Sequence, residues 1–391
     1  MTHAIMPTYT RLPVSFIRGQ GAWLWDQNNV RYLDALSGIA VCNLGHAHPA
    51  IHNAIAEQSR LLIHTSNLYE IDLQKKLANQ LTQLSGMSNA FFCNSGAEAN
   101  ETAIKLARLY GYSRCIEQPT IIVMDNSFHG RTLATLSATG NPKVHEGFSP
   151  LVDGFIHVPF NDIPAIKKII NDNPNIVAIM AEPIQGEGGV NIPAPTYLND
   201  LRQVCDQHKL LLILDEIQTG IARTGRFLAY QHNDILPDIC TLAKALGNGV
   251  PIGACLATGK AAQLLTAGKH GSTFGGNLLA CRAALSVLDT IQQDNLIHAA
   301  ETKGNKIVDE ITKRLGRHPL VYDIRNQGMM IAIELTQPCQ TLTQKALDHK
   351  ILINVTAEKV IRLLPPLVIT EEQIILLADT LQALLENTST L

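Results

Sequence analysis

The stretch LLLILDEIQTG, residues 210–220, begins with a short apolar run and ends in two acidic residues and a turn. The stretch ICTLAKALGNG, residues 239–249, repeats this pattern with a lysine after the apolar run. Short apolar runs bounded by turn residues are typical of strands buried on both faces. We therefore predict strands over residues 210–214 and 239–242, each with charged residues just beyond its carboxyl end.

Similar apolar runs lie at residues 90–93, 121–125 and 176–181, and segments with helical periodicity separate them. Residues 97–110 and 196–208 each place apolar side chains on one helix face. Alternation of strands and helices predicts an α/β fold, in which a mostly parallel sheet is covered by helices on both faces.

The end of the chain has a different pattern. Strand-like runs at residues 320–325, 329–335, 351–355 and 360–364 precede a helical stripe over residues 371–386. This order predicts a smaller α+β domain, joined to the large domain by a long helix near residue 283. We expect three parts: an N-terminal segment (1–60) that packs with the small domain, a large domain (61–282), and the C-terminal small α+β domain (283–391).

Composition excludes several classes of function. A net charge of −3 provides no basic excess for nucleic-acid binding. The apolar runs are much shorter than the ~20 residues of a membrane span. The eight cysteines are scattered without a CxxC pair, which favours the cytoplasm and argues against a zinc site or a disulfide framework. His46 and His48 have no third ligand at metal-binding spacing, so we expect no metal.

The motif NSGAE, residues 94–98, follows one predicted strand and opens a helix. Small residues at such a turn expose backbone N–H groups, and the helix dipole also favours an anion there. The alternative is a plain serine N-cap followed by a glycine turn. No GxxxxGK[ST] motif is present, so a nucleoside triphosphate is a weak interpretation.

Two further strand ends carry charged residues. Asp215 and Glu216 follow a wholly apolar strand, where unpaired carboxylates would be costly; an aspartate that caps a helix is the alternative. Lys244 lies among alanine, leucine and glycine, a setting that lowers a lysine pKa and leaves a nucleophilic amine; a surface lysine is the alternative. An anion cradle, a carboxylate and a lysine together match pyridoxal 5′-phosphate, which needs an anchored phosphate, a protonated ring nitrogen and a lysine Schiff base.

These residues belong to a longer set of motifs that resembles the class III pyridoxal-phosphate-dependent aminotransferases, which have fold type I. The similarity covers most of the chain, and the separation of Asp215 and Lys244 matches the family pattern. The shared motifs are SGIAV (37–41), LGHAHP (44–49), SGAEAN (95–100), FHGR (128–131), EPIQGEGG (182–189), GSTFGGN (271–277), and Arg362 before two prolines.

The resemblance implies that Lys244 binds the cofactor aldehyde and transfers the proton, while Asp215 pairs with the ring nitrogen. Phe128 would stack on the ring, Gln218 would lie near its 3′-oxygen, and Thr273 would reach the phosphate from the other subunit. The full set of implied cofactor contacts is Ser95, Gly96, Ala97, Phe128, Asp215, Glu216, Ile217, Gln218, Lys244 and Thr273.

For substrate, the resemblance implies that Arg131 holds the α-carboxylate and that Ser272 contacts the substrate bound in the neighbouring subunit. Glu187 and Arg362 would form a switch pair, in which 2-oxoglutarate or glutamate releases Arg362 from Glu187. The protein is therefore expected to be a homodimer with shared active sites.

The implied reaction, part of arginine biosynthesis, converts N-acetylornithine and 2-oxoglutarate to N-acetylglutamate 5-semialdehyde and glutamate. N-succinyl-diaminopimelate is a further implied substrate. The alternatives are an ornithine δ-aminotransferase or another class III ω-aminotransferase, a 2,1-aminomutase, and a pyridoxal-phosphate-binding regulatory protein. Retention of Lys244, Asp215 and Arg131 argues against the regulatory protein.

Overall fold

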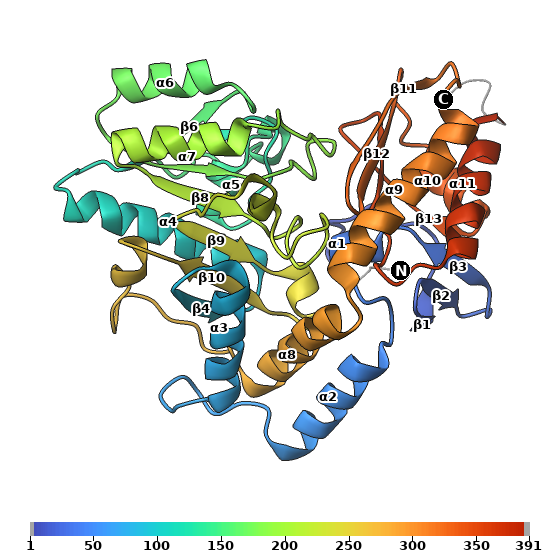
Figure 1. Cartoon of the computed structure of the whole chain (residues 1–391), viewed down its shortest axis with the longest axis horizontal. Helices are drawn as coiled ribbons and strands as arrows, with labels where there is room; N and C mark the ends of the chain where they lie inside the picture. Colours follow the sequence, from blue (N-terminus) through green and yellow to red (C-terminus); the bar gives the residue numbers. More distant parts are fainter. Residues whose placement is uncertain (1–3, 387–391) are drawn as a thin grey trace.

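The computed structural model describes residues 4–386, and its centre is a seven-stranded sheet with the order β4–β10–β9–β8–β7–β5–β6 (Figure 1). Strands β5 to β9 pair in parallel, whereas β10 is antiparallel to both of its neighbours. The predicted α/β fold with a mostly parallel sheet is therefore confirmed. The strands are β4 (Asn89–Cys93), β5 (Thr120–Met124), β6 (Phe155–Val158), β7 (Ile176–Ala181), β8 (Leu211–Asp215), β9 (Ile239–Leu242) and β10 (Gly253–Ala257).

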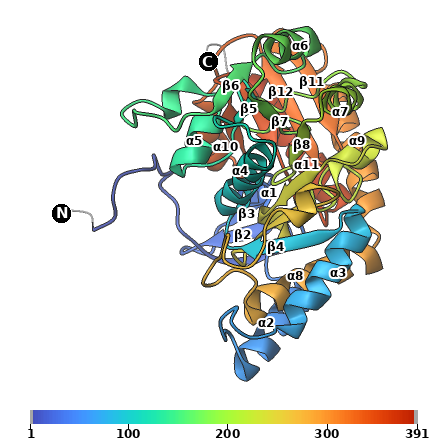
Figure 2. The ribbon, with the colours of Figure 1, turned by 90° about the vertical axis from the view of Figure 1, so that its left-hand side faces the viewer.

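Helices cover both faces of this sheet because successive side chains of each strand point to opposite sides. Ile213 of β8 belongs to the apolar cluster formed with α4 (Gly96–Ser113). Leu212 and Leu214 belong to the opposite cluster, to which α3 (Asp72–Ser85), α7 (Tyr197–His208) and α8 (Leu278–Gln293) contribute. Figure 2 shows α3 and α8 side by side below the sheet. The remaining helices of this part are α5 (Leu133–Ala138) and α6 (Ile163–Asp172).

The second part of the structure contains two four-stranded sheets, with the orders β1–β2–β3–β13 and β11–β12–β15–β14. The first sheet joins the two ends of the chain, because β13 pairs in parallel with β3. The strands are β1 (Phe16–Gln20), β2 (Trp23–Asp26), β3 (Arg31–Asp34), β11 (Val321–Gln327), β12 (Met330–Leu335), β13 (Ile351–Leu352), β14 (Asn354–Thr356) and β15 (Val360–Leu363). The helices are α1 (Ser37–Ala40), α9 (Leu296–Leu315), α10 (Leu342–Asp348) and α11 (Glu371–Glu386), whereas α2 (Pro49–Leu61) packs against α8 of the first part.

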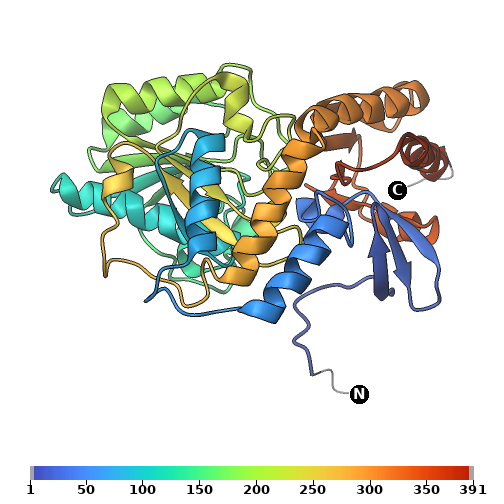
Figure 3. The ribbon, with the colours of Figure 1, turned by 60° about the horizontal axis from the view of Figure 1, so that its bottom comes forward.

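Two predictions for this part were wrong in detail. The single strand predicted over residues 351–355 is two strands in different sheets, with the buried Ile353 between them. The long helix predicted near residue 283 is two helices, α8 and α9, separated where Asn295 adopts a left-handed φ of 51°. Helix α8 packs against α2 and α3, whereas α9 packs against α11 (Figure 3). The predicted division at residues 60 and 282 stays a prediction.

Between residues 4 and 386, we find no helix that is both long and apolar enough to cross a membrane.

Candidate active site

A cavity of about 400 Å³ lies at the carboxyl ends of β4, β8 and β9. Its volume is in the range of small-molecule sites. Strand β10 runs in the opposite direction, so the residues before it, including Ile252, also line the cavity. The predicted site residues among its lining are Ser95, Gly96, Ala97, Phe128, Arg131, Glu187, Asp215, Ile217, Gln218 and Lys244.

The N-terminus of α4 forms one wall of the cavity. Ser95 is the N-cap, and its hydroxyl accepts a hydrogen bond from Glu98 N at 3.2 Å. The Glu98 carboxylate accepts one in return from Asn94 N at 2.5 Å. The serine cap that the sequence left as an alternative is thus present. Because a helix leaves the N–H groups of its first turn without intrahelical partners, Gly96 and Ala97 can still donate to an anion.

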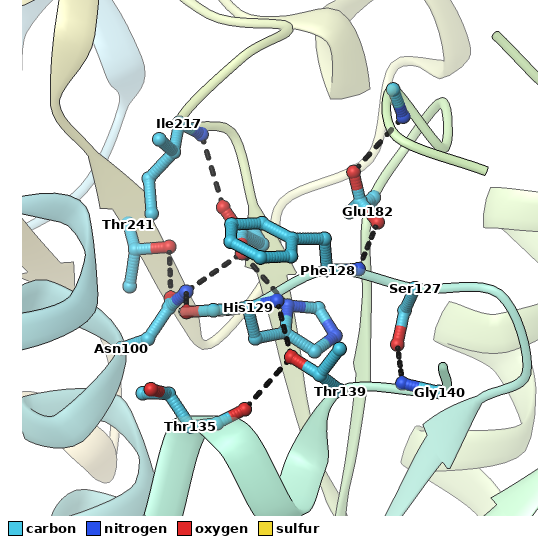
Figure 4. A network of polar contacts seen from close by, with 12 residues as sticks. Asn100, Ser127, Phe128, His129, Thr135, Thr139, Gly140, Glu182, Ile217 and Thr241 are labelled. Carbon is cyan, nitrogen blue, oxygen red and sulfur yellow. Dashed lines mark hydrogen bonds and ion pairs between the residues drawn. The ribbon is translucent and has the colours of Figure 1, made fainter. Parts of the chain in front are cut away.

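Asp215, the last residue of β8, is held by three donors, from Asn100, His129 and Ile217, which are labelled in Figure 4. Its Oδ2 accepts from Asn100 Nδ2 at 2.7 Å and from His129 Nδ1 at 2.8 Å, and its Oδ1 accepts from Ile217 N at 3.1 Å. Thr241 in turn donates to the Asn100 side-chain oxygen at 2.8 Å. A buried carboxylate with this many donors is fixed in orientation.

Lys244 begins a short 3₁₀ turn just after β9 and has a left-handed φ of 45°. Burial lowers the pKa of its ammonium group, although the nearby carboxylates of Glu187 and Asp215 oppose this effect. A lysine with a lowered pKa in a cavity is a candidate nucleophile and general base.

A second carboxylate, Glu182, lies beside the cavity and follows β7. Its Oε1 accepts from Phe128 N at 2.9 Å and its Oε2 from Gly186 N at 3.1 Å. Burial raises the pKa of Glu182 to about 7; His129 opposes this shift and Asp215 adds to it. Glu182 therefore fixes the backbone at Phe128, whose ring faces the guanidinium of Arg131 at 5.7 Å.

Arg362, in the middle of β15, is fully buried and makes a salt bridge to Glu187 Oε1 at 2.8 Å. Its Nη1 also donates to Gln218 Oε1 at 3.4 Å, and its Nε donates to Asn354 Oδ1 at 3.0 Å. The remaining Nη2 is buried and has no hydrogen-bond partner within residues 4–386. Arg362 thus contacts two residues that line the cavity, Glu187 and Gln218, and its Nη2 remains available as a donor.

Besides Arg362, three of the predicted residues lie outside the cavity wall. The Glu216 carboxylate accepts from Tyr230 N at 2.9 Å and from the Thr219 hydroxyl, and burial raises its pKa to about 7. The Ser272 hydroxyl accepts from Asn94 Nδ2 at 3.2 Å, and Thr273 is exposed. The roles predicted for Ser272 and Thr273 concern a neighbouring subunit and stay predictions.

The sequence reasoning assigned no role to Asn100, His129, Thr241 or Glu182. Asn100 and Thr241 lie inside an apolar helix and an apolar strand, where a polar residue was the available signal; His129 and Glu182 lie within the motifs FHGR and EPIQGEGG. Burial of such groups without partners is costly, so each of them requires a polar neighbour.

The residues around the cavity fit pyridoxal 5′-phosphate. A Cβ on Gly96 would lie 2.8 Å from Ile217 Cδ1, so only glycine lets the first turn of α4 and the residue after Asp215 pack this closely. Asp215 keeps acceptor capacity beyond its three donors, because a carboxylate accepts about four hydrogen bonds. Across the described residues, no group of three or more histidine, cysteine or acidic side chains is arranged to hold a metal ion.

Comparison with known proteins agrees with this arrangement. The family model for "Aminotransferase class-III" matches residues 4–385. The acetylornithine aminotransferase of Nitrosomonas europaea is 58% identical over 94% of this chain and 93% of its own length. The ornithine aminotransferase of Toxoplasma gondii superimposes with a TM-score of 0.94 at 34% identity, over 98% of this chain and 92% of its own.

A second solved structure, the acetylornithine aminotransferase of Elizabethkingia anophelis, gives a TM-score of 0.87 at 36% identity, covering 97% and 96% of the two chains. A family match over nearly the whole chain, together with relatives well above 30% identity, identifies the family. The chain belongs to the class III aminotransferases.

Proposed function

We propose that this aminotransferase moves the δ-amino group of N-acetylornithine to 2-oxoglutarate, and forms N-acetylglutamate 5-semialdehyde and glutamate. The observation that carries the proposal is the salt bridge from the buried Arg362 to the partly exposed Glu187, beside the cavity that contains Lys244 and Asp215. The 58% identity to the Nitrosomonas europaea acetylornithine aminotransferase supports the choice of amino donor.

Pyridoxal 5′-phosphate is the cofactor; when bound, it supplies an aldehyde carbon that takes up the amino group and a protonated ring that delocalises charge. The first turn of α4 would hold its phosphate through the N–H groups of Gly96 and Ala97. Asp215, fixed by Asn100 and His129, would keep its ring nitrogen protonated. The Lys244 amine would remove the proton from Cδ of acetylornithine and deliver it later, as base and then acid.

The arginines would distinguish the two substrates. Arg131 would pair with the α-carboxylate of acetylornithine, which has no second carboxylate for Arg362. In that half-reaction Glu187 neutralises Arg362, because a buried unpaired guanidinium would be costly. 2-Oxoglutarate brings a second carboxylate that would displace Glu187, and the unpartnered Nη2 of Arg362 supports this exchange.

An amino-donor panel with 2-oxoglutarate tests the proposal. The donors are acetylornithine, ornithine, N-succinyl-diaminopimelate and 4-aminobutyrate, compared by kcat/KM. We expect kcat/KM for acetylornithine to exceed that for ornithine by at least about tenfold. Ornithine carries a charged α-amine where acetylornithine carries a neutral amide, and a site that fits the amide discriminates against the amine. A higher kcat/KM for ornithine would instead support an ornithine δ-aminotransferase.

The proposal includes a homodimer with shared sites. Leu68 is 87% exposed and Phe274 is 60% exposed, and their segments are joined by hydrogen bonds from Asn67 to the carbonyl groups of Ser272 and Gly275. An exposed apolar patch of this kind favours a protein interface. All eight cysteines carry free thiols, in keeping with a cytoplasmic enzyme.

Mixing two inactive variants, Lys244→Ala and Thr273→Asp, tests the shared site. Each mixed dimer would contain one site with an intact Lys244 and an intact Thr273 from the other subunit. We expect part of the activity to return on mixing. An active monomer in sedimentation analysis would contradict the proposal.

A further inference from the structure

Arg223 lies in the loop after β8 and is among the largest fully buried side chains of the protein. It forms no salt bridge within the described part of the chain, and its Nε is buried without a hydrogen-bond partner there. Burial lowers the pKa of Arg223 to about 9, an effect that Asp34 opposes, so the group remains a cation at neutral pH. A buried cation without a paired carboxylate is costly and requires an explanation.

The guanidinium group joins three segments that are far apart in the sequence. Its Nη1 donates to Pro365 O at 2.6 Å and to Met329 O at 3.2 Å, and its Nη2 donates to the side-chain oxygen of Asn43. Asn43 is held on both sides, because its Nδ2 donates to Ile221 O at 2.9 Å and its carbonyl accepts from Leu367 N at 2.8 Å.

These contacts lie next to the switch pair in the sequence. Pro365 is three residues beyond Arg362, and Gln218, which accepts from Arg362, is five residues before Arg223. The hydrogen bonds of Arg223 therefore connect the loop that contains Gln218 to the segment that follows β15. The turn before Met329 approaches equally closely, since a Cβ on Gly328 would lie 2.5 Å from the Thr224 carbonyl carbon.

We propose that Arg223, held by Asn43, is a positioning residue that sets the place of Arg362 and thereby the recognition of the second carboxylate of 2-oxoglutarate. This inference rests on the proposed function, in which Arg362 binds that carboxylate. Only arginine suits the position, because its planar fork donates in several fixed directions, whereas a lysine amine acts as a point charge.

The alternative is that Arg223 only stabilises the fold. In that case its replacement would lower the unfolding temperature and change both half-reactions alike, since both use the same cavity. A positioning residue for Arg362 affects the dicarboxylate substrate selectively, because acetylornithine reacts while Arg362 is paired with Glu187.

The test compares the holoenzymes of the wild type, Arg223→Lys, Arg223→Met and Arg362→Ala, with Arg226→Met as the control. Arg226 is an exposed arginine three residues further along the same loop. Two quantities are measured for each protein: KM and kcat for both substrates, and the dissociation constant of glutarate, an unreactive dicarboxylate, by calorimetry. Thermal unfolding reports on stability separately.

For Arg223→Met we expect glutarate binding to weaken and the KM for 2-oxoglutarate to rise by about tenfold, with the KM for acetylornithine changed less than about threefold. Arg223→Lys should fall between Arg223→Met and the wild type, Arg362→Ala should show the same selectivity more strongly, and Arg226→Met should match the wild type. If Arg223→Met does not fold, Asn43→Ala removes the acceptor while keeping the arginine, and should give a smaller selective shift.

Equal changes in both KM values, or unchanged glutarate binding in a folded Arg223→Met or Asn43→Ala protein, would overturn the inference. Failure of the wild type to use acetylornithine would instead contradict the proposed function, and the glutarate comparison would still report on Arg223.

Discussion

Asp215 has a carboxylate whose orientation depends on residues from two other elements, Asn100 in α4 and His129 after β5. Asp215 and Lys244 could be singled out from the sequence because each is a charged residue next to an apolar run, which is a local pattern. Asn100 could not, because its partner is 115 residues away and only the folded sheet brings them together.

Replacement of Asp215 by asparagine tests this residue directly. An amide is uncharged and cannot hold the ring nitrogen protonated, so we expect kcat with acetylornithine to fall by at least about 100-fold. The protein should still fold, since asparagine keeps the shape and one acceptor. Asp206→Asn, a change at an exposed aspartate, serves as the control. Near-normal turnover of the Asp215→Asn holoenzyme would show that the carboxylate has another role.

At the scale of elements, the junction between β4 and α4 shows how a short motif builds a site. The Ser95 hydroxyl caps the helix at Glu98 N, the Glu98 carboxylate accepts from Asn94 N, and Gly96 packs against Ile217 from the loop after β8. The strand, the turn and the helix were all predictable from residues 90–110. The packing of Ile217 was not, because it depends on the order β4–β10–β9–β8 in the sheet.

Gly96→Ala places a Cβ 2.8 Å from Ile217 Cδ1 and forces that side chain to move. We expect the variant to bind pyridoxal 5′-phosphate at least about fivefold more weakly, because the first turn of α4 would shift. The double variant Gly96→Ala with Ile217→Ala should recover most of this loss, and Ile217→Ala alone is the control. Cofactor affinity is measured by titration of the apoenzyme. Additive effects of the two changes would mean that the contact between Gly96 and Ile217 does not determine the position of the first turn of α4.

At the scale of the whole molecule, the N-terminal and C-terminal parts of the chain share one sheet. Strand β13 pairs with β3, and Leu364 N donates to Ala35 O at 2.7 Å. The sequence pattern over residues 351–355 predicts one strand because local hydrophobicity does not reveal which sheet each residue joins. Strand β10 was missed for a related reason, since its small residues Gly253 and Ala254 give no strong β signal.

His46 connects this N-terminal region to protein stability. Burial alone would lower its pKa, but hydrogen bonds to Asp34 and Cys42 outweigh burial and raise the pKa to about 9 from 6.5. Asp34 is itself fixed by Leu36 N at 2.9 Å and Ser37 N at 2.8 Å. The folded state therefore binds this proton more tightly than the unfolded chain does, so the stabilisation is full below pH 6.5 and is lost as the pH rises through about 9.

Urea unfolding at pH 6.5 and pH 9 checks this linkage. From the pKa difference, the unfolding free energy of the wild type should fall by up to about 3 kcal/mol more than that of His46→Gln over this range. His298→Gln, at an exposed histidine, should behave as the wild type. An identical pH dependence in the wild type and His46→Gln would show that the proton on His46 does not stabilise the fold.

The most direct test of the central claim is a single half-reaction without acceptor. The holoenzyme is mixed with excess N-acetylornithine, and the semialdehyde formed is counted against active sites. We predict about one equivalent per site, since the amino group stays on the enzyme until 2-oxoglutarate is added and glutamate is released. No semialdehyde from acetylornithine, while another amino donor gives one equivalent, would contradict the proposed function.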